Sequence, residues 1–233
     1  MNFLYNKNGL AFWTQREIEV REMLVGYIVG GISDNLKSQN KAFQVMRVEA
    51  PMLTPLELIN PNYSVEDYYK LDNSDDLVLR PETTMGSYRY VQWLLGHTET
   101  KTRLPICVWQ HGKSFRREQD QVTKNMRLKE FCQLEFQCIY GLTTENDYSK
   151  SLIPSVRKMI VDLIGPCRIE DSDRLPDYSE RTVDIICEKT NMEVCSISQR
   201  KDFEWTNNNV VSKGKNLEIA IGTDRCVFNF LEK

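Results

Sequence analysis

Charged and aromatic residues gather in two segments in the middle of this 233-residue chain. The first segment covers residues 114–118 and reads SFRRE, and the second is Glu130-Phe131, which follows after a polar stretch. Arginine side chains can bind an anion through two parallel hydrogen bonds, and an aromatic ring beside them can stack on a flat ligand. The two segments therefore predict a site for a planar, negatively charged molecule.

The sequence around these groups predicts a pair of strands that positions them. From Arg127 to Cys138 polar and apolar residues alternate, so that Glu135 and Gln137 fall on one face and Phe136 on the other. This period of two is typical of a strand with one buried face. Phe131 falls on the charged face, where it could stack on a ligand or pack into the core.

Composition narrows the class of protein. Hydrophobic residues make up 41% of the chain and charged residues 27%, as in ordinary soluble domains. The net charge of −3 does not favour tight, sequence-independent binding to long nucleic acids. Seven cysteines without a C-x-x-C pair argue against a disulfide framework or a zinc site and predict a reducing, cytoplasmic setting. The most apolar segment, 23–32, is about half the length of a membrane-spanning helix, so no membrane contact is predicted.

The pattern of predicted elements indicates an α+β fold. Thr14 and Glu17 have the spacing of a capping box that opens a helix reaching about Leu36. Pro154 lies in a further predicted helix and predicts either a kink or a later helix start. The other predicted helix covers 84–95, strands cover 43–50, 76–79, 183–187, 192–197 and 217–221, and a polar loop covers 206–214. Strands joined by short turns predict one domain over 1–233, an antiparallel β-sheet flanked by helices.

Six segments together carry a family resemblance. The SFRRE segment and Glu130-Phe131 resemble the second motif of class II aminoacyl-tRNA synthetases, and Glu218 to Arg225 resembles the third. The stretch Arg80-Pro81-Glu82-Thr83 resembles a segment of glycyl-tRNA synthetases, residues 193–205 resemble the strand before the third motif, and 48–53 resembles the first motif. The resemblance covers nearly the whole chain and implies the class II catalytic-domain fold.

The resemblance implies an enzyme that activates an amino acid with ATP and forms an aminoacyl-adenylate. Arg116 would bridge the amino-acid carboxylate and the α-phosphate, and Arg225 would hold the far end of the triphosphate. Glu118 would accept a hydrogen bond from the adenine amino group, Phe131 would stack on the ring, and Arg127 would also bind ATP. Positioning and electrostatics can supply the rate of such a reaction without a nucleophilic side chain.

The same resemblance implies the other ligands of the site. Glu82 and Glu135 would receive the amino group of a small amino acid, in a pocket that Arg80 and Ala220 also line. Glu193 and Glu218 would bind ATP and hold Mg²⁺, a hard cation that prefers oxygen ligands. The implied partners are the acceptor end of a tRNA and, in a homodimer, a second copy of the chain.

Departures from the glycyl pattern leave alternatives open. Ala220 replaces the serine of the third motif and Ile219 the preceding proline, while residues 194–198 also resemble seryl-type enzymes. The substrate could therefore be glycine or another small amino acid. Because the sequence has no C-terminal anticodon-binding domain, a carrier-protein acceptor and a non-catalytic accessory role are further alternatives. Glu82 could simply begin a helix, where its charge would favour the helix dipole.

Overall fold

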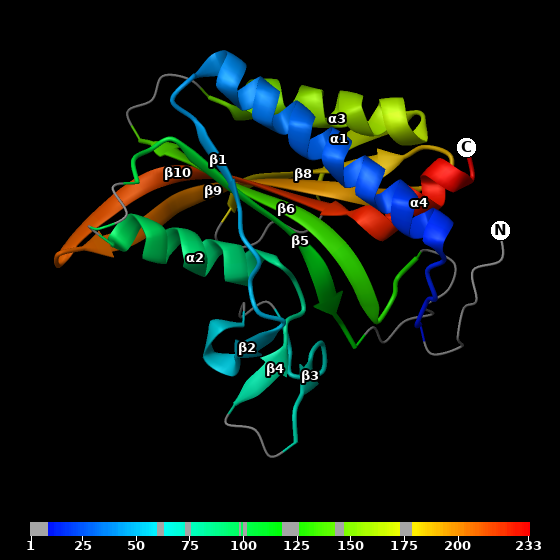
Figure 1. Cartoon of the computed structure of the whole chain (residues 1–233), viewed down its shortest axis with the longest axis horizontal. Coiled ribbons are helices and arrows are strands. Elements are labelled where there is room, and N and C mark those ends of the chain that lie inside the picture. The colour runs from blue at the N-terminus through cyan, green and yellow to red at the C-terminus, as the bar shows by residue number, and fades with distance from the viewer. Residues whose placement is uncertain are drawn as a thin grey trace.

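The computed structural model describes residues 9–59, 63–72, 76–97, 99, 102–117, 126–142, 147–172 and 179–233. Within these residues a seven-stranded sheet forms the centre of the fold, with three helices on one face and one helix on the other (Figure 1). The helices on the first face are α1 (Gln15–Gln39), α3 (Ser149–Ile164) and α4 (Thr223–Leu231), and the helix on the other face is α2 (Thr84–Gly96).

The large sheet is antiparallel except at one edge. Its strands lie in the order β1 (Gln44–Arg47), β5 (Ile106–Phe115), β6 (Glu130–Gly141), β10 (Val210–Gly222), β9 (Met192–Asn207), β8 (Ser179–Cys187) and β7 (Cys167–Asp171). The edge strand β1 pairs with β5 in parallel, and the other neighbours are antiparallel. The predicted fold class, an antiparallel sheet flanked by helices, is confirmed.

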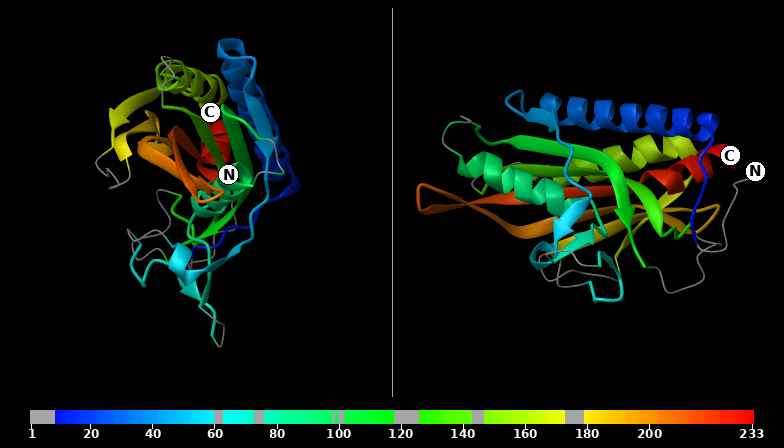
Figure 2. Two further views of the ribbon diagram at one scale, coloured as in Figure 1. Left: turned by 90° about the vertical axis from the view of Figure 1, so that its left-hand side faces the viewer. Right: turned by 60° about the horizontal axis from the view of Figure 1, so that its bottom comes forward.

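A smaller sheet lies beside the large one. It orders β2 (Leu53–Pro55), β4 (Leu77–Leu79) and β3 (Tyr69–Lys70), with a 3-10 turn over Leu56–Leu58. Figure 2 shows this small sheet on the side of the large sheet away from α1 and α3. Together with α2 it borders the part of the large sheet that carries the charged residues.

The two faces of the large sheet differ in chemistry. Leu134, Phe136 and Cys138 of β6 are fully buried in a core that they share with α1, α3 and α4. The residues between them, Glu135 and Gln137, point to the opposite face, as their alternation predicts. On that opposite face α2 covers a second apolar cluster, and polar side chains occupy the area next to it.

The first helix begins where the sequence predicts. Thr14 is its N-cap, and the reciprocal contacts between Thr14 and Glu17 form the expected capping box. The helix around Pro154 begins at Ser149, so the proline lies inside α3 and does not start it. No helix among the described ranges is both long and apolar enough to cross a membrane.

The polar loop predicted over 206–214 is wrong. Strand β9 continues to Asn207 and β10 begins at Val210, so the two strands form a long hairpin. Asn208 and Asn209 form its turn with φ angles of 47° and 63°. A two-residue turn of this kind needs positive φ at both positions, and asparagine tolerates that conformation. Because the residues of the hairpin are mostly exposed and polar, their sequence did not indicate that they form strands.

Candidate active site

The candidate site lies on the sheet face opposite α1, α3 and α4, where the strand register aligns polar residues from three strands. Glu218 of β10 is the partner of Gln137 on β6 and of Ser198 on β9. Two residues further along β10, Ala220 lies between Glu135 on β6 and Ser196 on β9. The sheet therefore presents two carboxylates side by side, with the small side chain of Ala220 next to them.

Glu135 is a fully buried carboxyl group with three side-chain hydrogen bonds. Thr83 donates to its Oε2 at 2.7 Å, and Ser87 and Gln137 donate to its Oε1 at 2.8 Å and 2.7 Å. Burial, reinforced by the nearby charge of Glu218, raises the pKa of Glu135 to about 7 despite these hydrogen bonds. The group is therefore prepared to bind a proton or an ammonium ion near neutral pH.

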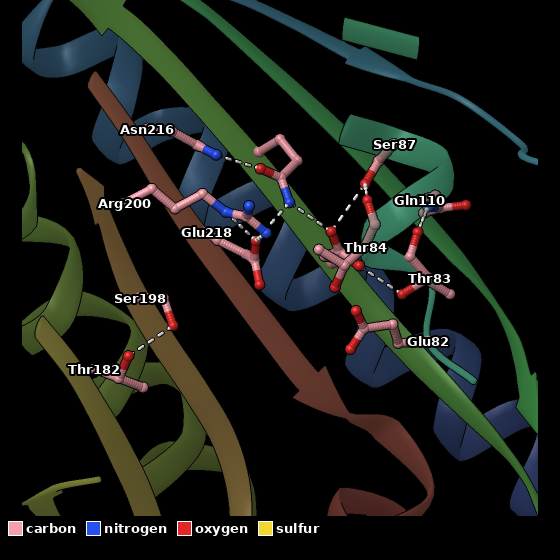
Figure 3. Close-up of polar contacts among 12 residues, drawn as sticks. Glu82, Thr83, Thr84, Ser87, Gln110, Thr182, Ser198, Arg200, Asn216 and Glu218 are labelled. Carbon is pink, nitrogen blue, oxygen red and sulfur yellow. Dashed lines mark hydrogen bonds and ion pairs between the residues drawn. The ribbon is translucent and has the colours of Figure 1, made fainter. Parts of the chain in front are cut away.

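Glu218 is held in an ion pair. The Arg200 guanidinium donates to its Oε2 from Nε at 2.8 Å and also from Nη2, and Gln137 donates to the same oxygen at 3.1 Å (Figure 3). Asn216, two residues before Glu218 on β10, donates to Oε1 of Gln137 at 2.6 Å and fixes that amide. Glu218 is thus neutralised inside the protein.

Glu82 directly precedes the start of α2 and supplies the third carboxyl group. Tyr63 donates to its Oε2 at 2.8 Å. Its Oε1 is buried and has no hydrogen-bond partner among the described residues. Burial raises the pKa of Glu82, while the charge of Arg116 opposes that rise. Because buried carboxylate oxygens are normally satisfied, this oxygen has the capacity to accept a donor from a ligand.

Arg116 directly follows the last residue of β5 and interacts electrostatically with Glu82. Its Nε donates to the backbone oxygen of Pro81 at 3.0 Å. Its guanidinium lies over the rings of Phe131 and Tyr63, 5.2 Å and 5.5 Å from their centroids. Phe131 also packs against the small apolar cluster that contains Met192. The ring therefore packs in a cluster and contacts the predicted catalytic arginine at the same time.

Arg225 and Glu193 mark the far end of the site. Arg225, in the first turn of α4, donates from Nη1 to the backbone oxygen of Glu193 at 2.7 Å. Glu193 is exposed, but Glu218 lies opposite Ser198, five residues further along β9. At about 3.3 Å per residue this separation is roughly 16 Å. The structure thus does not bring the two predicted Mg²⁺ ligands together, and Glu218 is already bound to Arg200. No cluster of three or more acidic, His or Cys side chains suited to a metal occurs in the described ranges.

Arg80 is buried and binds backbone carbonyl groups. Its Nε donates to Lys113 at 2.8 Å, and its Nη1 donates to Ala50 at 2.7 Å and to Pro51 at 3.2 Å. These contacts join β5 to the segment after β1, close to the predicted first motif. Arg80 therefore has a clear role in holding the walls of the site, and its direct contact with an amino acid stays a prediction.

We expect Arg80→Gln to lower the free energy of unfolding by about 3 kcal/mol, because one buried and two partly buried carbonyl groups lose a charged donor. Urea denaturation at pH 7 measures this change. Arg117→Gln is the matched control, since Arg117 is an exposed arginine near the same strand end, and its effect should stay within about 0.5 kcal/mol. Equal losses in the two variants would contradict the role assigned to Arg80.

Two of the other predicted site residues are less defined by contacts. Glu118 lies outside the described residues. Arg127 is partly exposed in the segment that enters β6. Their predicted contacts with ATP stay predictions.

Several residues of the site were not among the predicted ligands. Ser87 lies four residues after Thr83, which places both hydroxyl groups on one side of the first turns of α2. Gln137 and Asn216 share the strand faces of Glu135 and Glu218, and the period of two could have identified them. Tyr63 and Arg200 reach the site from distant segments, and no local spacing in the sequence signals their contacts. The missed residues are Tyr63, Thr83, Ser87, Gln137, Arg200 and Asn216.

Comparisons with known proteins show which family the sequence matches. Residues 63–226 match the profile of the tRNA synthetase class II core domain (G, H, P, S and T). A glycine–tRNA ligase of Staphylococcus saprophyticus is 29% identical over 185 residues, covering 69% of this chain and 39% of the relative. A glycine–tRNA ligase of Staphylococcus aureus is 34% identical over 128 residues, covering 49% of this chain and 25% of the relative.

A solved structure shows the same fold. The prolyl-tRNA synthetase of Cryptosporidium parvum, crystallised with halofuginone and AMPPNP, superposes with a TM-score of 0.71 and 13% identity, covering 97% of this chain and 48% of that one. The chain thus spans less than half the length of each of these proteins. The match of the family profile over residues 63–226 places the chain in the family of class II tRNA synthetase core domains.

Proposed function

We propose that the chain activates a small amino acid, glycine by similarity, with ATP, and transfers it to the acceptor end of a tRNA. In the first step the amino-acid carboxylate attacks the α-phosphorus of ATP, and pyrophosphate leaves with the electrons of the broken P–O bond. In the second step an acceptor hydroxyl attacks the acyl carbon, and AMP leaves. Relatives named glycine–tRNA ligase support this assignment.

The observation that carries the proposal is the placement of Arg116 near the buried carboxyl group of Glu82. A free amino acid has an ammonium group and a carboxylate a few ångströms apart. The unpartnered Oε1 of Glu82 and the buried Glu135 suit the ammonium group. The guanidinium of Arg116, which electrostatically opposes the pKa rise of Glu82, suits the carboxylate and the α-phosphate.

The outer part of the site would bind ATP. Phe131 lies under Arg116, where the adenine could share the same stack of planar groups. Arg225 would bind the end of the triphosphate, because its guanidinium lies at the exposed edge next to Glu193. Glu118 and Arg127 would complete the ATP contacts. Mg²⁺ accompanies ATP in solution, but Glu193 and Glu218 do not fit one shared ion, and no step proposed for these residues depends on it.

We also propose a homodimer in the cytoplasm. The edge strand β1 pairs on one side with β5, and α1 exposes the side chains of Met23 and Tyr27. A sheet edge without a strand partner among the described residues, together with the exposed apolar side chains on α1, supports association with a second copy. All seven cysteines are free and buried, which suits a reducing compartment. Sedimentation equilibrium measures the mass in solution, and a monomer at micromolar concentration would contradict the dimer.

The exchange of radiolabelled pyrophosphate into ATP tests the activity. We expect exchange with glycine or another single small amino acid among the twenty standard ones, and none without amino acid. Charging of total tRNA with the same amino acid then tests the acceptor. Exchange without tRNA charging would support a different acceptor such as a carrier protein, and a complete absence of exchange would contradict the proposed activity.

A further inference from the structure

We propose that Arg200 is a positioning residue of the amino-acid pocket: by binding Glu218, it leaves Glu135 and Glu82 to receive the amino group of the substrate. The proposal rests on the proposed function. Arg200 and Glu218 are 10% and 8% exposed, so the pair lies almost entirely inside the protein. No ligand contact of Arg200 itself is required.

Arg200 is held from two sides. Its guanidinium group faces Glu218, to which both Nε and Nη2 donate hydrogen bonds. Its planar group also lies over the ring of Tyr88 on α2, 4.8 Å from the centroid. Tyr88 in turn packs edge to face against Phe203 of β9, with centroids 4.7 Å apart. A guanidinium fixed by stacking and by two hydrogen bonds loses little freedom when it binds a carboxylate.

The need for a cation at this place follows from the spacing of the carboxyl groups. The amide nitrogen of Gln137 donates to Glu135 at 2.7 Å and to Glu218 at 3.1 Å, so one donor bridges the two groups. Two carboxylates this close repel each other and tend to keep a proton between them. The charge of Arg200 offsets Glu218, which lets Glu135 ionise when an ammonium group arrives.

Other charged groups facing Glu135 do not replace Arg200 in this role. Arg80 interacts with Glu135 electrostatically, but its hydrogen bonds go to backbone carbonyl groups. Arg116 is the main cation that acts on Glu82, with a smaller contribution from Arg200, and Tyr88 is a phenol whose pKa burial raises. The charged groups that interact with Glu135 are Glu218 and Arg80. Glu218 and Arg200 also interact with Glu82 and with Tyr88.

The test compares the pH dependence of kcat/KM for the amino acid in pyrophosphate exchange. Arg200→Gln leaves Glu218 unpaired, so more protons stay bound to the two carboxyl groups. We expect the acid limb of the profile to move upward by about one pH unit, which makes the variant-to-wild-type ratio roughly five- to tenfold lower at pH 6 than at pH 8.5. Arg200→Lys keeps the charge, and its ratio should stay constant within about twofold.

Two further variants distinguish a positioning role of Arg200 from a general disturbance of the structure. In the double variant Arg200→Gln/Glu218→Gln the carboxylate that needs a cation is absent, so the acid limb should return toward its wild-type position. Arg21→Gln is the matched control, since Arg21 forms a comparable buried pair with Asp224 at 2.8 Å, and it should not move the limb.

The outcomes distinguish this proposal from the proposed function. A wild-type protein with exchange, together with an Arg200→Gln ratio that is equal at pH 6 and pH 8.5, would overturn the role of Arg200 alone. An acid limb of the kcat/KM profile that stays at higher pH in the double variant would also overturn the role of Arg200. A wild-type protein without exchange with any amino acid would overturn the proposed function and this inference with it. Thermal melting of each variant at both pH values verifies that folded protein is compared.

Discussion

Replacing Arg116 with alanine is expected to lower the rate of pyrophosphate exchange at least about 100-fold, with a much smaller effect on folding. Its guanidinium lies over the ring of Phe131 and interacts electrostatically with the buried carboxyl group of Glu82. Charge that develops on the α-phosphate during transfer needs a fixed donor there, and removal of one such donor typically costs two to three orders of magnitude in rate. Initial rates at saturating amino acid and ATP measure the loss in kcat.

Arg117→Ala is the control for this experiment. Arg117 follows directly in the chain, and its side chain is exposed, whereas Arg116 is partly buried between two rings. Exchange by Arg117→Ala should stay within about twofold of the wild-type rate, because no ligand contact is assigned to this residue. A loss of activity that is equal in the two variants would indicate a general effect of charge near β5 and would contradict the specific role of Arg116.

The period of two along β6 was sufficient to predict which side chains form the core and which line the site. Phe136 and Glu135 lie on opposite faces as the alternation requires, and the sheet flanked by helices follows from the same pattern. The capping box at Thr14 could likewise be predicted, because its contacts lie within four residues of each other. Such features depend on local spacing, which a single sequence contains.

Contacts between distant segments were harder to predict. Arg200 and Glu218 meet because β9 and β10 form a long hairpin, and the sequence of that hairpin looked like a polar loop at 206–214. Tyr63 reaches Glu82 from a segment with little regular structure. The ion pair also changes the interpretation of Glu218, since a carboxylate bound to an internal arginine is poorly available to a metal ion. Which charge neutralises which carboxylate depends on strand pairing and register.

Replacing Glu135 with glutamine is expected to stabilise the protein above neutral pH and to remove its activity. The pKa of Glu135 is raised from 4.5 to about 7, mainly because the carboxyl group is buried. Below pH 4.5 the group is protonated in both the folded and the unfolded chain. Between about pH 4.5 and pH 7 the unfolded chain releases this proton, whereas the folded protein keeps it because ionisation would bury a charge. Stability is therefore lost as the pH rises over this range. The loss is roughly 3 kcal/mol for this group.

Urea denaturation of both proteins at pH 4.5, 6, 7 and 8 measures this difference. The Glu135→Gln variant and the wild type should be about equally stable at pH 4.5, and the advantage of the variant should grow up to about pH 7 and then level off. The raised pKa values of Glu82 and Asp224 contribute to both proteins and largely cancel in the difference. Glu130→Gln, a partly exposed carboxylate on the same strand, should show a flat difference within about 0.5 kcal/mol. A flat difference for Glu135→Gln too would contradict its raised pKa.

The expected activity of Glu135→Gln explains why the protein keeps a buried carboxyl group that lowers its stability. Thr83 and Ser87 donate to different oxygens of Glu135, and glutamine keeps only one of these acceptors. It also cannot neutralise an ammonium ion. We therefore expect kcat/KM for the amino acid to fall at least about 100-fold in pyrophosphate exchange, while KM for ATP stays within about threefold, because a buried charge left without its partner costs several kcal/mol. Higher stability together with lost activity would identify Glu135 as a carboxylate kept for its ligand, and a variant that is both more stable and fully active would exclude it from the pocket.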